Sequence, residues 1–164
     1  GMMPKPDKAA LAALIERVEK GESGREMDAA VMFDVFAHPV GQSKIDGGPT
    51  GYLWPEDNAS WSFGIRFPGK SREWFNDVRR ANEGAETLVI NRDGALVLMN
   101  ALRIPHLTTS IDAQEALPGT VDWVEQISSI LWGATVGLRE GVAPTEPLAR
   151  LAAKLRAIME AGDE

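Results

Sequence analysis

Apolar residues near the start of the chain recur at the spacing of one helical face. The first stripe comprises Leu11, Leu14, Ile15 and Val18. Pro6 or Asp7 precedes it and Gly21 follows it, and these residue types commonly begin and end helices. The spacing therefore predicts a helix that ends near Lys20.

A second helical stripe follows, with Met27, Ala30, Val31 and Val35. Ser23 and Glu26 stand three positions apart before it, which is the spacing of a capping box. The pattern predicts a second helix that stops before His38 and Pro39.

The middle of the chain has a different composition from the two helical stripes before it. Residues 39–60 are rich in Gly, Pro, Asn and Asp and predict an irregular excursion. Residues 60–67 then alternate between polar and apolar, which predicts a half-buried strand. Ser71 is placed to cap a short helix carrying Trp74, Phe75 and Val78. Two apolar runs within residues 86–100, separated by the turn residues 91–94, predict a β-hairpin.

The C-terminal third has a short helix, an ambiguous stretch and a long helix. Thr109 or Ser110 can cap a helix that runs to Ala116. Residues 121–138 fit either one helix or two strands bearing tryptophan, and we favour strands. The last helix follows Thr145 and has an apolar stripe from Leu148 to Met159; Arg150, Lys154 and Glu160 fall outside that stripe.

Composition narrows the class of protein. The 164 residues fit a single α+β domain over residues 1–164. The chain has no cysteine, which excludes disulfides and thiolate metal sites and suits the cytoplasm. Its net charge of −7 and the lack of a basic stripe argue against nucleic-acid binding. No apolar run approaches a membrane span, and the run at residues 9–15 is a poor signal peptide.

Three segments resemble the phage ABA sandwich family of small phage and prophage proteins, which has no established activity. They are LIERVE at 14–19 with SGREMDAA at 23–30, TTSIDA at 108–113 with ALP at 116–118, and TEPLA at 145–149. The resemblance covers about residues 11–37 and 103–160, and one departure is Leu107, where the family tends to have an aromatic residue. It implies a three-layer sandwich, an antiparallel sheet with helices on both faces, in the cytoplasm of a bacterial host.

One segment formally matches a phosphate-binding loop. Residues 64–71 read GIRFPGKS, which fits the pattern G-x-x-x-x-G-K-S. However, Ile65 and Phe67 continue the apolar face of the predicted strand, and a phosphate loop would expose both of these side chains. We therefore prefer a strand and a turn, and nucleotide binding remains the alternative.

A polar cluster is the other candidate ligand site. Its members are Arg25, Asp28, His106, Thr108, Thr109 and Asp112. They can line a pocket for a small polar ligand or supply a general base. The alternative, which we favour, is that the charged members pair with each other or cap helix ends, because no nucleophile, base and orienting group can be assembled from their spacing.

No cofactor, metal site or catalytic residue is predicted, since the chain has only two histidines, His38 and His106. Tyr52 and Trp54 form an aromatic cluster on the irregular excursion, where they can anchor a protein partner. We expect a non-enzymatic accessory protein that acts through protein–protein contact or self-association. The alternative is a small-molecule or nucleotide-binding protein, including an enzyme, that uses the polar cluster or residues 64–71.

Overall fold

Internal contacts divide the chain into two compact units. The first comprises Gly1–Met3 and Phe36–Ile104, and the second comprises Pro4–Val35 and Pro105–Glu164. The computed structural model describes residues 7–36, 38–40, 50–53, 64–67, 71, 73–74, 76–77, 87–92 and 94–161, with the backbone alone for 38–40, 50–53 and 64–67. The assignment of residues 1–164 to one domain remains a prediction.

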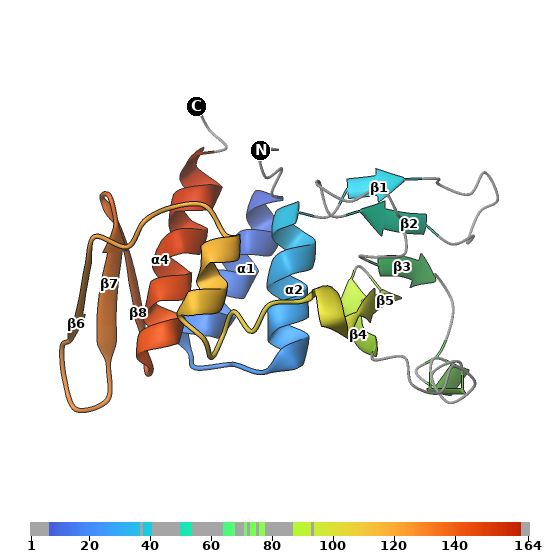
Figure 1. Cartoon of the computed structure of the whole chain (residues 1–164), viewed down its shortest axis with the longest axis horizontal. Helices are drawn as coiled ribbons and strands as arrows, with labels where there is room; N and C mark the ends of the chain where they lie inside the picture. The colour runs from blue at the N-terminus through green and yellow to red at the C-terminus, as the bar shows by residue number, and fades with distance from the viewer. Residues whose placement is uncertain are drawn as a thin grey trace. The chain divides into compact units, whose positions relative to one another are not determined.

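The first unit contains a five-stranded sheet in the order β1-β2-β3-β5-β4, in which every neighbouring pair is antiparallel. The strands are β1 (His38–Val40), β2 (Thr50–Leu53), β3 (Gly64–Phe67), β4 (Thr87–Arg92) and β5 (Ala95–Asn100) (Figure 1). The strand expected from the alternation at residues 60–67 is confirmed over the part described. A short 3₁₀ turn, η2 (Ala101–Arg103), follows β5.

The irregular excursion expected over residues 39–60 instead contains strands. His38–Val40 and Thr50–Leu53 pair with each other, and the second of these also pairs with Gly64–Phe67. The pairing joins backbone groups and needs no apolar periodicity in the sequence. Pro39 is tolerated because β1 lies at the edge of the sheet, where a missing N–H group breaks no ladder.

The hairpin predicted at residues 86–100 is confirmed. Arg92 pairs with Ala95, and Gly94 in the connecting turn has a φ of +75°, a conformation that glycine adopts without strain. Val89, Leu96 and Leu98 are buried together, and Trp74 packs against them. Ser71 accepts a hydrogen bond at 3.2 Å from the backbone N–H of Trp74, as expected of a helix cap.

The second unit begins with two helices, α1 (Lys8–Glu19) and α2 (Arg25–Phe36). The side chain of Asp7 accepts from the backbone N–H of Ala10 at 3.2 Å, which confirms the expected start of the first helix. The second helix starts later than the capping-box pattern requires, since the carbonyl of Gly24 accepts the N–H of Asp28 at 2.9 Å. The backbone N–H of Gly24 donates to the hydroxyl of Thr108, which lies far along the chain, so a tertiary contact sets this boundary.

The C-terminal part of the second unit folds as a 3₁₀ helix, a three-stranded sheet and a helix. These are η3 (Asp112–Ala116), β6 (Trp123–Gln126), β7 (Trp132–Val136), β8 (Arg139–Ala143) and α4 (Glu146–Ala161). The choice of strands over residues 121–138 is confirmed. The strand β8 was missed, because polar residues and Gly141 occupy most of it and leave no apolar alternation.

The structure is therefore α+β, with helices packed against strands and two small antiparallel sheets. In the second unit, the sheet order is β6-β7-β8, and α4 lies between this sheet and α1 (Figure 1). Among the described helices, none is long and apolar enough to cross a membrane.

The sheet approaches α4 most closely at Gly141. A Cβ atom at this position would meet the carbonyl oxygen of Ala149 and the amide nitrogen of Ala153, and would lie 2.8 Å from the Cβ of Ala152. Those three alanines are fully buried. The absence of a side chain on β8 and the small side chains on α4 thus allow the two backbones to touch.

The side chain of Glu19 joins three elements of the same unit. Its Oε2 atom accepts from the backbone N–H of Val142 at 3.1 Å, and its Oε1 atom pairs with the guanidinium of Arg156. The outer edge of β8 is thereby attached to α1 and α4, and one of its backbone donors is satisfied.

We predict that Gly141→Ala lowers the free energy of unfolding by more than about 2 kcal/mol, because the new methyl group would meet backbone atoms that cannot rotate away. Gly133→Ala on the adjacent strand is the matched control. Its methyl group would meet only the side chains of Trp123 and Ile127, and we expect a loss below about 1 kcal/mol. Equal stability of the two variants in urea unfolding would contradict the proposed close approach.

Candidate functional site

Asp28 is a buried carboxylate whose two oxygens are both occupied. Its side chain is 1% exposed. Its Oδ1 atom accepts from the backbone N–H of Thr108 at 2.8 Å and from the hydroxyl of Thr108 at 2.7 Å. Its Oδ2 atom accepts from the guanidinium of Arg25 at 2.8 Å. A carboxylate in such a position is held by neighbouring groups and is closed to an outside ligand.

The partners of Asp28 connect the start of α2 to the turn at residues 105–110. The hydroxyl of Thr108 accepts from the backbone N–H of Gly24 at 3.0 Å while it donates to Asp28. The guanidinium of Arg25 also donates to the carbonyl of Pro105 at 3.3 Å. The network thus satisfies an N-terminal amide of the helix and joins segments about eighty residues apart.

The other members of the predicted cluster lie elsewhere. His106 and Thr109 are exposed on the turn that carries Thr108. Asp112 lies on η3 and lines a different part of the surface. Arg25, Asp28 and Thr108 therefore form an internal network, which agrees with the alternative that the charged residues pair with each other. Asp112 lies outside this network. Ligand binding by the six residues as one site stays a prediction.

A second buried polar group lies where α4 meets η3. Lys154 is 7% exposed, although the sequence places it outside the apolar stripe of its helix. Its ammonium donates to the carbonyls of Gln114 at 2.8 Å and Leu117 at 3.4 Å. These carbonyls close η3, where a cation is favourable because the last carbonyls of a helix carry partial negative charge.

Gln114 fixes the same region from within the core. Its side chain is 1% exposed, and its amide nitrogen donates to the carbonyls of Leu107 at 2.9 Å and Pro147 at 2.7 Å. Both N–H groups are therefore used. This one side chain connects the turn at residues 105–110 to the first turn of α4, and Leu107 is itself fully buried.

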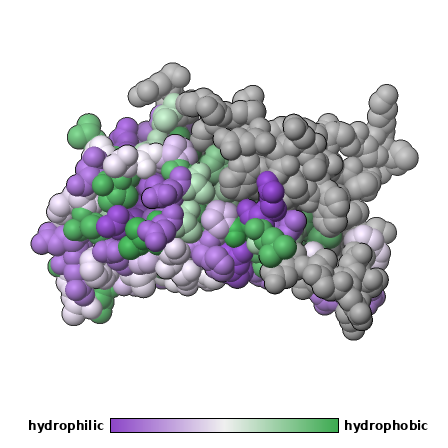
Figure 2. Space-filling view, viewed as in Figure 1, coloured by the Kyte–Doolittle hydropathy of each residue, from purple (hydrophilic) through white to green (hydrophobic). Residues whose placement is uncertain are grey.

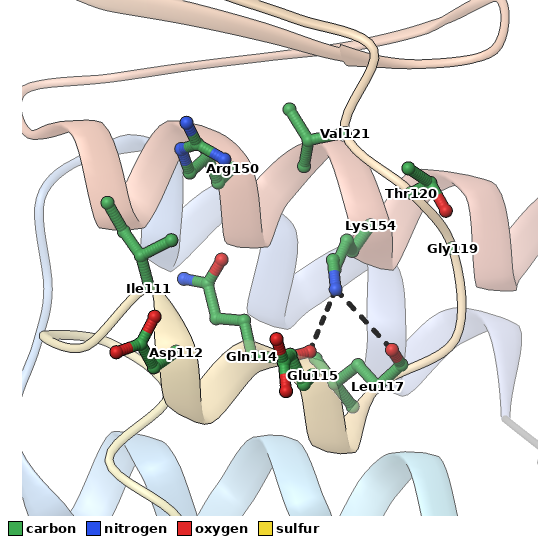
Figure 3. Close-up of a pocket in the computed structure, with 10 residues that line it drawn as sticks. All are labelled: Ile111, Asp112, Gln114, Glu115, Leu117, Gly119, Thr120, Val121, Arg150 and Lys154. Atoms are coloured by element: carbon green, nitrogen blue, oxygen red, sulfur yellow. Dashed lines mark hydrogen bonds between the residues drawn. The ribbon is translucent and has the colours of Figure 1, made fainter.

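Between η3 and α4 lies an open pocket of about 400 Å³ (Figure 3). Arg150 and Lys154 line it from α4, and Asp112 and Glu115 line it from η3. The connecting segment Gly119–Val121 adds a hydroxyl and an apolar side chain. The pocket therefore combines two cations, two carboxylates and apolar surface.

The pKa of Lys154 lies below its ordinary value of 10.5 because burial disfavours the charged ammonium. The carboxylate of Glu115 opposes this shift, and the guanidinium of Arg150 adds to it. The charges of Glu115 and Lys154 therefore attract each other.

The second sheet has one face that α4 does not cover. Gly141 faces α4 and pairs with Ala134, so the neighbouring Gly133 faces the opposite way. The rings and methyl groups of Trp123 and Ile127 lie over Gly133, and these side chains are 40% and 48% exposed. We call this surface the open face. From the side shown in Figure 2, hydrophobic and hydrophilic residues are interspersed over the second unit.

The other predicted sites fall on the first unit. In the segment that matches a phosphate loop, Gly64–Phe67 forms a strand paired with β2 on one side and β5 on the other. An extended strand of this kind cannot curl its amides around a phosphate. Trp54 and the side chain of Tyr52 lie outside the described residues, so the proposed partner anchor stays a prediction.

Sequence reasoning missed the residues that shape the pocket. The sequence places Arg150 and Lys154 outside the apolar stripe of their helix, and its pattern does not single out Gln114. The available signal was weak, because a lone polar residue beside an apolar stripe is usually solvated.

Across the described residues, no group of three or more acidic, His or Cys side chains is arranged to hold a metal ion.

We predict that Asp28→Ala lowers the free energy of unfolding by at least about 3 kcal/mol, because two donors of Thr108 lose their acceptor and Arg25 loses its carboxylate. Asp28→Asn retains one acceptor oxygen and should cost less. Glu26→Gln, at an exposed position of the same helical turn, is the control and should change stability by less than about 0.5 kcal/mol. Urea unfolding measures the free energies of unfolding of the three variants, and an Asp28→Ala variant as stable as the wild type would contradict the prediction.

The lowered pKa of Lys154 makes stability depend on pH. Between the folded pKa and 10.5, the unfolded lysine keeps a proton that the folded one has lost, so stability rises with pH in that window. We expect the wild-type protein to gain free energy of unfolding relative to Lys154→Met as the pH is raised toward 10.5. Lys20→Met, which removes an exposed lysine, serves as the control. A difference in free energy of unfolding between the wild type and Lys154→Met that stays constant with pH would contradict the lowered pKa of Lys154.

Comparison with protein-family models, curated proteins and solved structures found no match to this chain. A function must therefore be inferred from the chain's own surfaces. Those surfaces are the open face of the second sheet, together with its β6 edge, and the pocket between η3 and α4.

Proposed function

We propose that this chain is an accessory protein of phage or prophage origin that acts by self-association through β6 of the second sheet. The resemblance in three segments supports the origin. The observation that carries the mode of action is the exposure of Trp123 and Ile127 on a face and edge of the sheet that no other described element covers.

The two edges of the second sheet differ. The outer edge of β8 is met by Glu19, whose carboxylate accepts the N–H of Val142. At the other edge, no strand among the described residues pairs with the outer side of β6. An uncovered edge presents unpaired backbone donors and acceptors that a second strand can satisfy.

The direction of the backbone groups along β6 follows from its hairpin. Ile127 donates its N–H to the carbonyl of Leu131, toward β7. Because amides alternate along a strand, those of Val124 and Gln126 point away from β7, toward the free edge. Their side chains lie on the α4 side of the sheet, because Val124 pairs with Ala134, which shares a face with Gly141.

Charge selects the register between two copies. A two-fold axis at Glu125 would place two like charges opposite each other, which is unfavourable. An axis at Val124 instead places Trp123 of one copy opposite Glu125 of the other and lets the outward amides of Val124 pair. We therefore propose the second register, which produces a continuous six-stranded antiparallel sheet.

The three-layer arrangement belongs to the same proposal. In the paired sheet, α4 of each copy covers one face. The opposite face carries Trp123 and Ile127 and is suited to a second layer of helices.

We predict that Val124→Pro abolishes association and leaves the monomer folded, because proline removes the outward N–H while the hydrogen bonds to β7 remain. Val124→Ala loses more of the side chain but keeps the amide, so it should still associate. Sedimentation velocity over a series of protein concentrations reports the mass, and circular dichroism reports the fold. A wild-type protein that stays monomeric, or a Val124→Pro variant that associates normally, would refute the proposal.

Salt should strengthen association. Each copy carries a net charge of −7, so two copies repel each other at low ionic strength. We expect the dissociation constant to fall as sodium chloride is raised from about 0.01 M to about 0.15 M, over which the Debye length shortens to about 8 Å. Association that weakens with salt would instead indicate an interface held by opposite charges.

A further inference from the structure

The pocket between η3 and α4 is lined by two cations, Arg150 and Lys154. The ammonium of Lys154 carries three N–H groups, and two carbonyls among the described residues accept from it. The Nε atom of Arg150 is buried and has no hydrogen-bond partner among the described residues. This atom forms an ion pair with the carboxylate of Glu146 at 3.6 Å. An anion bound in the pocket would be attracted by the two positive charges, and the remaining N–H group of Lys154 could donate to it.

The two cations both line the pocket from α4. Arg150 and Lys154 are four residues apart on α4 and therefore lie on one face of the helix, the face that lines the pocket (Figure 3). Lys154 is almost fully buried, and the side chain of Arg150 is 23% exposed. A carboxylate has two oxygens and can accept from both cations at once.

The carboxylates of Asp112 and Glu115 form a second subsite on η3. Asp112 and Glu115 are three residues apart in a 3₁₀ helix, so their side chains project from the same side of η3. Both residues are exposed, in contrast to Lys154. A ligand would therefore meet the buried ammonium of Lys154 inside the pocket and the exposed carboxylates at its rim.

We propose that this pocket binds an α-amino acid, with its carboxylate on Arg150 and Lys154 and its ammonium on Asp112 and Glu115. The volume of about 400 Å³ accommodates a ligand of this size. The apolar side chains of Leu117 and Val121 line the remaining surface and would contact the amino-acid side chain. This site is separate from β6, so the inference goes beyond the proposed self-association.

The lowered pKa of Lys154 agrees with this arrangement. Burial disfavours its charge, and Glu115 compensates only in part. A carboxylate bound beside the ammonium would favour the charged form and offset the cost of burial.

The test is binding of the twenty protein amino acids, added one at a time and followed by the amide spectrum of the ¹⁵N-labelled protein. We expect at least one of them to shift the signals of η3 and α4 saturably. For that amino acid, the analogue without its ammonium should bind more weakly, and the analogue without its carboxylate should not bind. Failure of all twenty, or equal binding of inorganic phosphate, would overturn the proposal.

Two variants locate the site. Arg150→Gln should weaken binding at least about tenfold, because it removes one of the two cations that hold the carboxylate. Arg139→Gln is the matched control, since Arg139 is an exposed arginine on β8 with an ion pair to Glu160 at 3.5 Å, and its affinity should stay within about twofold of the wild type. Unchanged binding by Arg150→Gln would overturn the assignment. Val124→Pro should bind normally, which separates this outcome from that of the self-association test.

Discussion

The close approach of β8 to α4 at Gly141 is the constraint on which the second unit depends. The backbone of the strand meets the backbone of the helix near Ala149 and Ala153, so neither element can shift without opening a gap or a clash. Glu19 then joins this pair of elements to α1 through Val142 and Arg156. One face of the sheet therefore packs against α4, and the opposite face carries the exposed side chains of Trp123 and Ile127.

Two buried polar groups complete the same unit, and each connects segments that are distant in sequence. Asp28 holds the turn at residues 105–110 against the start of α2 through Thr108. Lys154 and Gln114 hold η3 against α4. Such groups tolerate few arrangements, because every donor or acceptor left without a partner in the interior costs free energy. They fix where η3 lies, and the position of η3 creates the pocket.

The two surfaces proposed to act differ in chemistry and are separate in structure. The β6 edge offers backbone groups and exposed apolar side chains, which suit a second copy of the chain. The pocket offers charges of both signs, with Lys154 buried and Asp112 and Glu115 exposed, which suit a small zwitterion. Association and ligand binding can therefore be tested one at a time, and no single substitution discussed above alters both.

Local sequence patterns determined most elements of this chain and few of their contacts. Apolar periodicity and capping residues were enough for α1, α4 and the hairpin at residues 86–100, because these signals act within a few residues. They failed for β1, β2 and β8, whose pairing depends on neighbouring strands. They grouped Asp112 with Asp28, whereas the described partners of the Asp28 carboxylate are Arg25 and Thr108. The burial of Lys154 was likewise invisible, since whether a lysine beside an apolar stripe meets water or a carbonyl depends on what packs over it. Only the tertiary structure decides such contacts, because they join segments that the chain itself does not bring together.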